Sequence, residues 1–424
     1  MKIGIVTQYY PPNILGGSQI SIFNIAKGLS MKGHSVEVFT SKSKDKTQNK
    51  KKFYLKNVTV YEIFKKEYSF GVVRTITKQK NMEKQLNEFL ERKNKHFDVL
   101  YAYGMDTIPA VLKCKKHAKK IAASVNGSWA TCPYYHIDYK GRESLNCSSL
   151  HYWYCTIQRI FRKNPVGSGT YKWIKIIFSP FIFFIYKKRL KMLKNMDIVM
   201  PISQKLKKIL INMGINKEKL FVCHNLFEKV IPDKEFSIFN KYNISEENKI
   251  ILFAGRLQKI KGCHTIIKAI PEIIAENKKV HLLFLGKGTE EKELRKIAEE
   301  LGVENYVTFG GFLSIKQLAK AYKEAYVTVY PSIFFDPLPR TPTESFMQDT
   351  PVIGTNRGGC EELIKNGYNG LIISPDNSKE LARSINRLLK DKKLSKKLSK
   401  NAIAFSKNFL IEKGIEDYIN AFKK

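Results

Sequence analysis

The chain has 424 residues, of which 43% are apolar, so it is long enough for two or three domains with a large buried core. It has no run of about 20 uncharged apolar residues and no signal-peptide layout at its N-terminus, so we expect a cytoplasmic protein without a transmembrane helix. The formal net charge of +36 attracts anions such as phosphorylated substrates, anionic lipid or nucleic acid, although a generally lysine-rich composition explains it equally well.

Apolar runs and helix-like segments alternate along the chain, which predicts α/β domains with parallel sheets. The N-terminal strands are expected at residues 3–6, 36–39, 58–63, 99–101 and 120–125, and the clearest helices at 18–31 and 76–93. After a long irregular segment come a strand at 197–200, a helix at 203–213 and a short strand at 220–223. The polar segment 228–248 is the expected linker to a second series, with strands at 250–254 and 326–330 and helices at 343–349 and 411–423.

Charged residues follow two of the strands in this second series. Arg256 and Lys261 are flanked by glycines after one strand, and Asp336 and Glu344 stand eight positions apart after another. Carboxylates accept hydrogen bonds from sugar hydroxyls, whereas Arg and Lys neutralise a diphosphate. Because open α/β sheets bind ligands where their strands end, this pattern predicts a site for a sugar nucleotide.

The chain resembles the retaining nucleotide-sugar glycosyltransferases of the GT-B type, in the family marked by an E-x7-E motif. The family pattern of Gly-Arg-Leu…Lys-Gly, Pro-Ser…Glu-x7-Glu and Gly-Gly-x-x-Glu is matched here at residues 255–262, 331–344 and 358–362. The resemblance implies two Rossmann-like domains facing each other across a cleft. We expect an acceptor-side domain at 1–226, completed by a C-terminal helix at 410–424, and a nucleotide-sugar-binding domain at 227–409.

The resemblance also implies the reaction, which is transfer of a hexose from a nucleotide-diphosphate sugar to an acceptor hydroxyl with retention. Arg256 and Lys261 would stabilise the leaving diphosphate, so no metal or other cofactor is required. Asp336 would hold the hexose hydroxyls and Glu344 the ribose hydroxyls, whereas the alternative for both acids is interaction with a helix dipole. The other donor-binding candidates are Gly16, Gly17, Gly255, Phe312, Leu338 and Arg340.

The glycine pair Gly16–Gly17 lies between the first strand and its helix, where the backbone can approach an anion closely. A tight turn that needs no ligand is the alternative for this pair.

Three positions depart from the family pattern. Asp336 replaces the usual Glu and is one methylene shorter, and Pro339 stands where relatives commonly carry Gly. Asn126 replaces a His near the reacting sugar, and Asn cannot act as an acid or base near pH 7. Asn126 and Asp336 keep open the alternative of a non-catalytic sugar-nucleotide-binding subunit. The alternative enzyme is a GT-B phosphorylase or sugar-phosphate synthase, which would use the same cleft.

Four side chains in the irregular segment form a candidate zinc site, namely Cys132, Cys147, His151 and Cys155. Three sulfurs and one imidazole suit tetrahedral zinc, but the usual C-x2-C spacing is missing and reduced thiols are favoured.

An apolar stretch at 174–186 is followed by Lys187, Lys188 and Arg189, which favours docking on an anionic membrane surface at the inner face of the cell membrane. A buried helix is the alternative, and Pro180 would kink either one. Docking would suit an acceptor that is a lipid-linked or cell-surface glycan precursor. Nucleic acid is not an expected partner, because the lysines are scattered and no zinc-finger, RRM or KH signature occurs.

Overall fold

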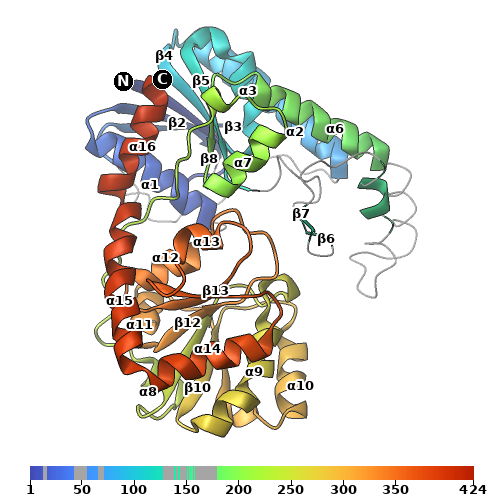
Figure 1. Ribbon diagram of the computed structural model, residues 1–424. Coiled ribbons are helices and arrows are strands. Elements are labelled where there is room, and N and C mark those ends of the chain that lie inside the picture. The colour runs from blue at the N-terminus through green and yellow to red at the C-terminus, as the bar shows by residue number, and fades with distance from the viewer. Residues whose placement is uncertain are drawn as a thin grey trace. The chain divides into compact units, whose positions relative to one another are not determined.

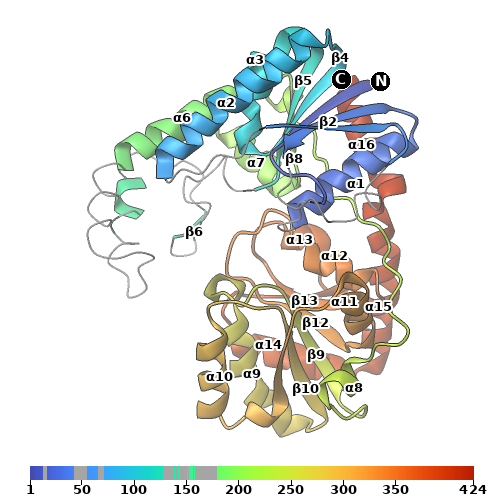
Figure 2. The ribbon, with the colours of Figure 1, turned by 180° about the vertical axis from the view of Figure 1, so that it is seen from behind.

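The computed structural model describes residues 1–12, 17–42, 55–64, 71–127, 138–139, 142–143, 150, 152–155, 157 and 179–424. The chain folds into two compact units, Met1–Leu226 together with Gly414–Lys424, and Phe227–Lys413. Each unit is built around a six-stranded parallel sheet covered by helices, as Figure 1 and Figure 2 show from opposite sides. The predicted α/β class with parallel sheets is therefore confirmed.

The sheet of the first unit has the strand order β3-β2-β1-β4-β5-β8, and its neighbouring strands are parallel. The first strand is almost fully buried, since Ile3, Ile5 and Val6 have no exposed surface. The strands of this sheet are β1 (Lys2–Thr7), β2 (Ser35–Ser41), β3 (Val58–Phe64), β4 (Phe97–Tyr103), β5 (Ala118–Val125) and β8 (Ile198–Pro201). A separate two-stranded ribbon consists of β6 (Asp138–Tyr139) and β7 (Arg142–Glu143).

The helices of the first unit connect these strands. They are α1 (Gly17–Met31), α2 (Gly71–Arg92), α3 (Ile108–Lys113), α6 (Ser179–Lys194) and α7 (Gln204–Asn212), with 3-10 turns at Met105–Thr107, Lys115–His117 and Lys217–Lys219. The last helix of the chain, α16 (Ile411–Lys423), returns to this unit. Its Phe422 ring lies 5.5 Å from the ring of Tyr101, and the hydroxyl of Tyr418 donates to the carbonyl of His224.

The sheet of the second unit has the order β11-β10-β9-β12-β13-β14, again with parallel neighbours. Its strands are β9 (Lys249–Ala254), β10 (Val280–Leu285), β11 (Val307–Gly311), β12 (Val327–Tyr330), β13 (Val352–Thr355) and β14 (Gly370–Ile373). Its helices are α8 (Ile238–Tyr242), α9 (Cys263–Glu276), α10 (Glu291–Glu300), α11 (Ile315–Glu324), α12 (Arg340–Phe346), α13 (Cys360–Leu363), α14 (Ser378–Lys390) and α15 (Lys392–Ser406), with 3-10 turns η6 (Lys259–Lys261), η7 (Glu304–Tyr306) and η8 (Lys407–Phe409).

Alternate residues of β9 enter two separate hydrophobic cores. Ile251 and Phe253 pack with α9, α10 and α14, whereas Ile250 and Leu252 pack with α8 and α11. Because successive side chains of a strand point to opposite faces, both faces of this central strand are buried. This explains why the predicted run at 250–254 is continuously apolar.

Several predicted boundaries were wrong. The expected strand at 220–223 is reduced to an isolated bridge between Leu220 and Val199, and the expected linker at 228–248 contains α8, whose Ile238 is buried. The helix expected from 343 begins at Arg340, because the first turn leaves its N–H groups unbonded and tolerates Pro342. For the same reason the first turn of α6 tolerates Pro180.

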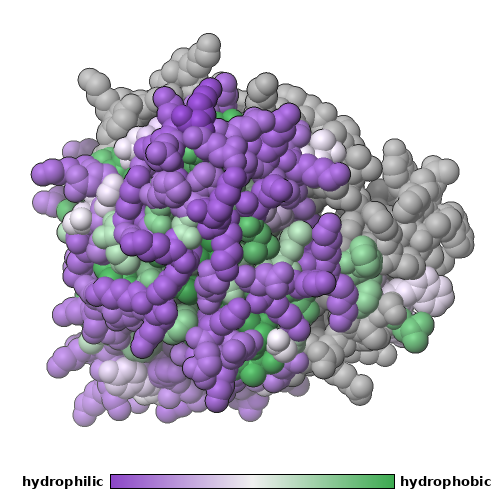
Figure 3. All heavy atoms as spheres, turned by 90° about the horizontal axis from the view of Figure 1, so that it is seen from above, coloured by the Kyte–Doolittle hydropathy of each residue, from purple (hydrophilic) through white to green (hydrophobic). Residues whose placement is uncertain are grey.

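Hydrophilic residues dominate the face seen in Figure 3, with smaller hydrophobic areas between them. Some large apolar side chains are nevertheless exposed, among them Phe184 at 65% and Phe312 at 72%. None of the helices in the described ranges combines the length and the apolar character that crossing a bilayer requires.

Candidate functional site

The charged candidates of the second unit follow its two central strands. β9 and β12 are neighbours, but β9 leads to β10 on one side of the sheet, whereas β12 leads to β13 on the other. The carboxyl ends of two such strands border a topological switch point, where open α/β sheets bind ligands. The loops that begin here carry Arg256 and Lys261 after β9, and Asp336 after β12.

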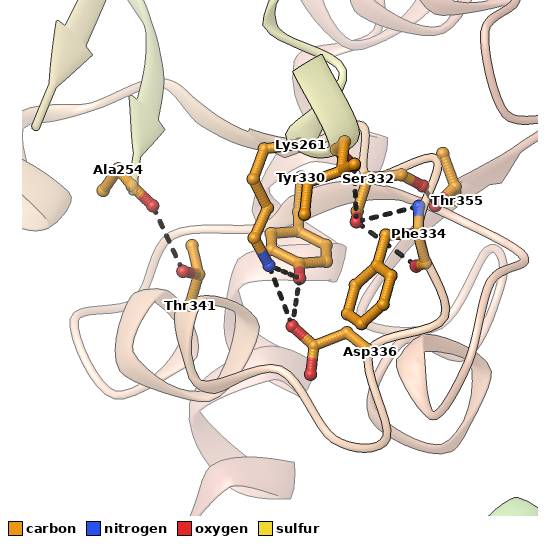
Figure 4. Close-up of polar contacts among 9 residues, drawn as sticks. Ala254, Lys261, Tyr330, Ser332, Phe334, Asp336, Thr341 and Thr355 are labelled. Carbon is orange, nitrogen blue, oxygen red and sulfur yellow. Dashed lines mark hydrogen bonds and ion pairs between the residues drawn. The ribbon is translucent and has the colours of Figure 1, made fainter. Parts of the chain in front are cut away.

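Lys261, Tyr330 and Asp336 form a closed triangle of hydrogen bonds, drawn in Figure 4. The Lys261 Nζ lies 3.0 Å from the Tyr330 hydroxyl and 3.0 Å from Asp336 Oδ2, and the Tyr330 hydroxyl lies 2.7 Å from the same Oδ2. The Lys261 ammonium also lies 5.3 Å from the centre of the Tyr330 ring and 5.8 Å from that of Phe334. The structure therefore brings together two of the predicted residues and one that the sequence analysis missed.

Burial makes this triangle a preorganised polar group. The side chains of Lys261 and Asp336 are only 15% and 23% exposed, so water screens their attraction less than it screens a surface pair. Tyr330 is 4% exposed, and burial, followed by the charge of Asp336, raises the pKa of Tyr330 well above its usual value. The phenol therefore stays protonated and remains a hydrogen-bond donor at physiological pH.

Glycines allow the loops around this triangle to approach each other. Gly262, next to Lys261, has φ +70°, and a Cβ there would lie 2.0 Å from the carbonyl oxygen of Pro331. On the other side, Gly359 donates its N–H to the carbonyl of Asp336 at 2.8 Å. Both contacts fix the backbone beside a charged side chain, so the glycines of the predicted motifs have a packing role here.

Arg340 and Glu344 form a second ion pair, one turn apart on α12. The Arg340 Nε lies 3.0 Å from Glu344 Oε1, and the guanidinium stacks 4.2 Å from the centre of the Phe227 ring. Burial, and then the charge of Glu344, raise the pKa of Tyr322 well above its usual value. The same helix is linked to β9, since the Thr341 hydroxyl donates to the carbonyl of Ala254 at 3.2 Å.

The other candidates of the second unit differ in how accessible they are. Arg256 is exposed, and no residue of the described ranges pairs with its guanidinium, whereas Leu338 is 4% exposed. The backbone of Gly255 packs closely against Gly286: a Cβ on Gly286 would lie 1.9 Å from the carbonyl oxygen of Gly255. The Phe312 ring is exposed, with the Lys287 ammonium 5.9 Å from its centre.

Two of the donor-site candidates of the first unit, Gly17 and Asn126, lie in the described residues. Gly17 opens α1 after β1, and half-buried Asn126 directly follows β5. Gly16 lies outside the described residues, as do three members of the candidate zinc site, Cys132, Cys147 and His151. The fourth, Cys155, is half-buried, and no three His, Cys, Asp or Glu side chains in the described ranges form a metal site.

Tyr330 is the residue that the sequence analysis overlooked. It ends the apolar run at 326–330, for which the sequence predicts only a strand. A signal was present, because a hydroxyl-bearing residue stands immediately before the loop that carries Asp336. A polar group at the end of a buried strand needs a hydrogen-bond partner in that loop.

Two family models match the chain, one in each half. Residues 15–228 match the model described as Glycosyltransferase Family 4, and residues 234–405 match Glycosyl transferases group 1. The chain belongs to glycosyltransferase family 4. Its enzymatic class is therefore that of a glycosyltransferase, as the sequence predicted.

The chain is also similar to curated proteins, one of which is named a glycosyltransferase. An uncharacterized glycosyltransferase of Methanocaldococcus jannaschii is 27% identical over 399 residues, which are 92% of this chain and 90% of that protein. The spore coat protein SA of Bacillus subtilis is 34% identical over 184 residues, which are 42% of this chain and 49% of that protein.

Solved structures show that the fold is shared well beyond these sequences. HepE of Anabaena, in complex with UDP, has a TM-score of 0.71 at 18% identity and covers 100% of both chains. The sucrose-phosphate synthase of Thermosynechococcus elongatus has a TM-score of 0.71 at 17% identity, covering 100% of this chain and 98% of that one. This family 4 glycosyltransferase therefore has the predicted GT-B fold.

Proposed function

We propose that this glycosyltransferase moves a hexose from a nucleotide-diphosphate sugar to an acceptor hydroxyl with retention at the anomeric carbon. The observation that carries the proposal is the Lys261–Tyr330–Asp336 triangle at the switch point of the second sheet. It combines a cation that suits a diphosphate with a carboxylate that suits sugar hydroxyls. Because HepE is solved with UDP and with UDP-glucose, a uridine nucleotide is the first donor to test.

The cations would act on the leaving group. The Lys261 ammonium has three N–H donors, of which the triangle uses two, so one remains for a phosphate oxygen. The exposed Arg256 guanidinium would supply a second charge from the same loop. Preorganised charges stabilise a departing diphosphate more than water does, and this role requires no metal ion or other cofactor.

The acids would hold the two sugars of the donor. Asp336 would accept hydrogen bonds from the hexose, and Glu344, already positioned by Arg340, from the ribose. In transfer, the bond from the anomeric carbon to the phosphate oxygen breaks and a bond to the acceptor oxygen forms. The leaving phosphate would take the acceptor proton, because Asn126 cannot accept one near pH 7.

The remaining candidates would complete the donor site. Gly17 at the start of α1 would present backbone N–H groups to an anion. Gly255 would let the loop after β9 approach the nucleotide. Leu338 would contribute only backbone groups, because its side chain is buried. The exposed ring of Phe312 would offer a stacking surface. Gly16 belongs to the same proposal.

The acceptor is proposed to be a lipid-linked or cell-surface glycan precursor, reached by docking on the inner face of an anionic membrane. The support is α6, where Phe184 is 65% exposed and Lys187 and Lys188 are exposed beside it. Apolar side chains next to basic ones are typical of interfacial helices. Figure 1 shows α6 as one long helix, which gives such a face a regular shape.

A second candidate is a subunit that binds the sugar nucleotide without turnover. The observation that favours it is Asn126, which follows β5 where the resemblance places a His. Such a subunit would keep the binding residues and lose only the chemical step.

Ligand-induced stabilisation tests the donor assignment. UDP, GDP and ADP and their glucose or mannose derivatives are added to the purified chain, and Tm is measured in the presence of EDTA. A cognate ligand at 100 times its Kd adds about 2.7 kcal/mol to the free energy of unfolding and raises Tm accordingly. If no nucleotide or nucleotide sugar raises Tm, the proposed donor site is wrong. Stabilisation that needs a divalent metal ion would contradict its metal independence.

Turnover separates the two candidates. Release of the nucleoside diphosphate from a stabilising nucleotide sugar, measured with a membrane extract as the source of acceptor, supports the transferase. Binding without release, under conditions in which a related transferase releases product, supports the non-catalytic subunit.

A further inference from the structure

We propose that Tyr330 is a specificity-determining positioning residue, which holds the Asp336 carboxylate by one oxygen and so presents the other oxygen to the sugar of the donor. This inference rests on the proposed function. It adds a residue that lies in a buried strand outside the matched motifs.

The direction of each hydrogen bond in the triangle is fixed by chemistry. An ammonium group only donates and an ionised carboxylate only accepts, whereas a phenol can do both. Lys261 therefore donates to the Tyr330 hydroxyl, and that hydroxyl uses its single proton for Asp336 Oδ2. A second donation from Lys261 reaches the same oxygen. Asp336 Oδ2 thus accepts from two groups.

The other carboxylate oxygen is left for a ligand. Within the described ranges no protein group bonds Asp336 Oδ1, and Figure 4 shows it turned away from Lys261 and Tyr330. With Oδ2 occupied, a sugar hydroxyl meets one fixed oxygen rather than a freely rotating carboxylate. A fixed acceptor costs less conformational entropy on binding and discriminates more sharply between hydroxyl positions.

The position of Tyr330 suits this role. It is the last residue of β12, so its backbone is held by the sheet, and its side chain is 4% exposed. Asp336 lies in a loop and has only two side-chain torsions, whose freedom the phenol removes. Since Asp is one methylene shorter than Glu, the chain pairs a short acid with a phenol that can reach it.

A hydroxyl deletion tests the inference, because Tyr330→Phe keeps the buried ring and removes only the two hydrogen bonds. The matched control is Tyr326→Phe, just before the other end of β12, where the hydroxyl donates to the carbonyl of Leu388. Calorimetry measures Kd for UDP and for UDP-glucose, or for the guanosine or adenosine pair if that one stabilises the wild type.

Tyr330→Phe is expected to weaken binding of the nucleotide sugar about tenfold, because the hydrogen bond that positions the Asp336 carboxylate is lost. Its affinity for the nucleoside diphosphate, which has no hexose, should change by less than about threefold, because Lys261 keeps its bond to Asp336. The control should leave both Kd values unchanged. An equal loss for both ligands, or no loss for either, would overturn the inference while the donor site stands. A wild type that binds no nucleoside diphosphate would overturn the proposed function itself.

A double-mutant cycle asks whether Tyr330 acts through Asp336. In an Asp336→Asn background, Tyr330→Phe should weaken binding of the nucleotide sugar by less than about twofold, because the carboxylate that Tyr330 positions is gone. Independent, multiplicative losses would show that Tyr330 does not work through Asp336 and would overturn the inference.

Discussion

Gly358 lies directly against the backbone of Asp336: a Cβ on Gly358 would come 2.0 Å from the Asp336 carbonyl oxygen. Gly358 also has φ +60°, a conformation that residues with a Cβ rarely adopt. The next residue, Gly359, donates its N–H to that same oxygen at 2.8 Å. The glycine turn therefore supports the loop that carries the proposed sugar-binding acid, and the family motif that spans it has a structural explanation.

Gly358→Ala is expected to displace this loop and to weaken nucleotide-sugar binding by at least about tenfold, since the methyl group cannot fit against a carbonyl. Stability should fall by about 2–3 kcal/mol, measured by urea unfolding. The matched control is Gly367→Ala, which has φ +74° but open space around the added Cβ. This control should lose only about 1 kcal/mol of stability, from backbone strain, and should keep its affinity for the nucleotide sugar. Equal effects of the two variants would show that strain alone, and not contact with Asp336, matters.

The sequence predicted the architecture well because that architecture depends on local patterns. Alternating strands and helices fix a parallel α/β sheet, and Lys261 and Asp336 follow two of its strands. The sequence shows that the hydroxyl of Tyr330 needs a hydrogen-bond partner, but it does not show which group supplies that partner. The bond from the Tyr330 hydroxyl to Asp336 is local, whereas the bond from Lys261 to that hydroxyl forms only when β9 and β12 become neighbours, which is a long-range property. The start of α12 was missed for a local reason, the presence of Pro342.

Removing either cation of the second unit should slow the proposed reaction. Arg256→Ala and Lys261→Ala are each expected to lower kcat/KM for the cognate donor about 100-fold, because charge on the leaving diphosphate loses a preorganised partner. Circular dichroism and Tm should show a folded chain. Lys259→Ala is the control: Lys259 is exposed in the same turn but stands outside the matched pattern, and its loss should have little effect. Near-normal rates in both Arg256→Ala and Lys261→Ala would remove these residues from the donor site.

The second unit should lose stability in mild acid because of His281. Burial lowers the pKa of His281 to about 4, and its Nε2 lies 2.8 Å from the Thr308 hydroxyl. The unfolded chain binds a proton at this residue below about pH 6.5, whereas the folded chain binds it only near pH 4. Stability is therefore fully present above pH 6.5 and falls as the pH drops towards 4, by at most about 1.4 kcal/mol per pH unit.

Urea unfolding of the wild type and His281→Leu between pH 7.5 and 4.5 checks this effect. The variant cannot titrate at this position, so the difference in unfolding free energy between the two proteins should be constant above pH 6.5. Below that pH the difference should move in favour of the variant. A difference that stays constant down to pH 4.5 would mean that His281 is not kept neutral by burial.

The exposed face of α6 should bind anionic vesicles. Phe184 would enter the lipid interface, and Lys187 and Lys188 would each add about 1 kcal/mol at low salt, weakened as salt rises. Co-sedimentation with vesicles of phosphatidylglycerol and phosphatidylcholine should therefore decrease with salt. Phe184→Ser should reduce binding at every salt concentration, whereas Lys187→Gln/Lys188→Gln should remove mainly the salt-dependent part.

General attraction of a basic protein to an anionic surface is the competing explanation, and the control addresses it. Lys396→Gln/Lys397→Gln removes two exposed lysines from α15 and changes the net charge by the same amount. If docking occurs through α6, this control should sediment with vesicles like the wild type. An equal loss in both lysine pairs, together with no effect of Phe184→Ser, would show that total charge and not this helix drives the interaction. The acceptor would then no longer be expected at a membrane surface.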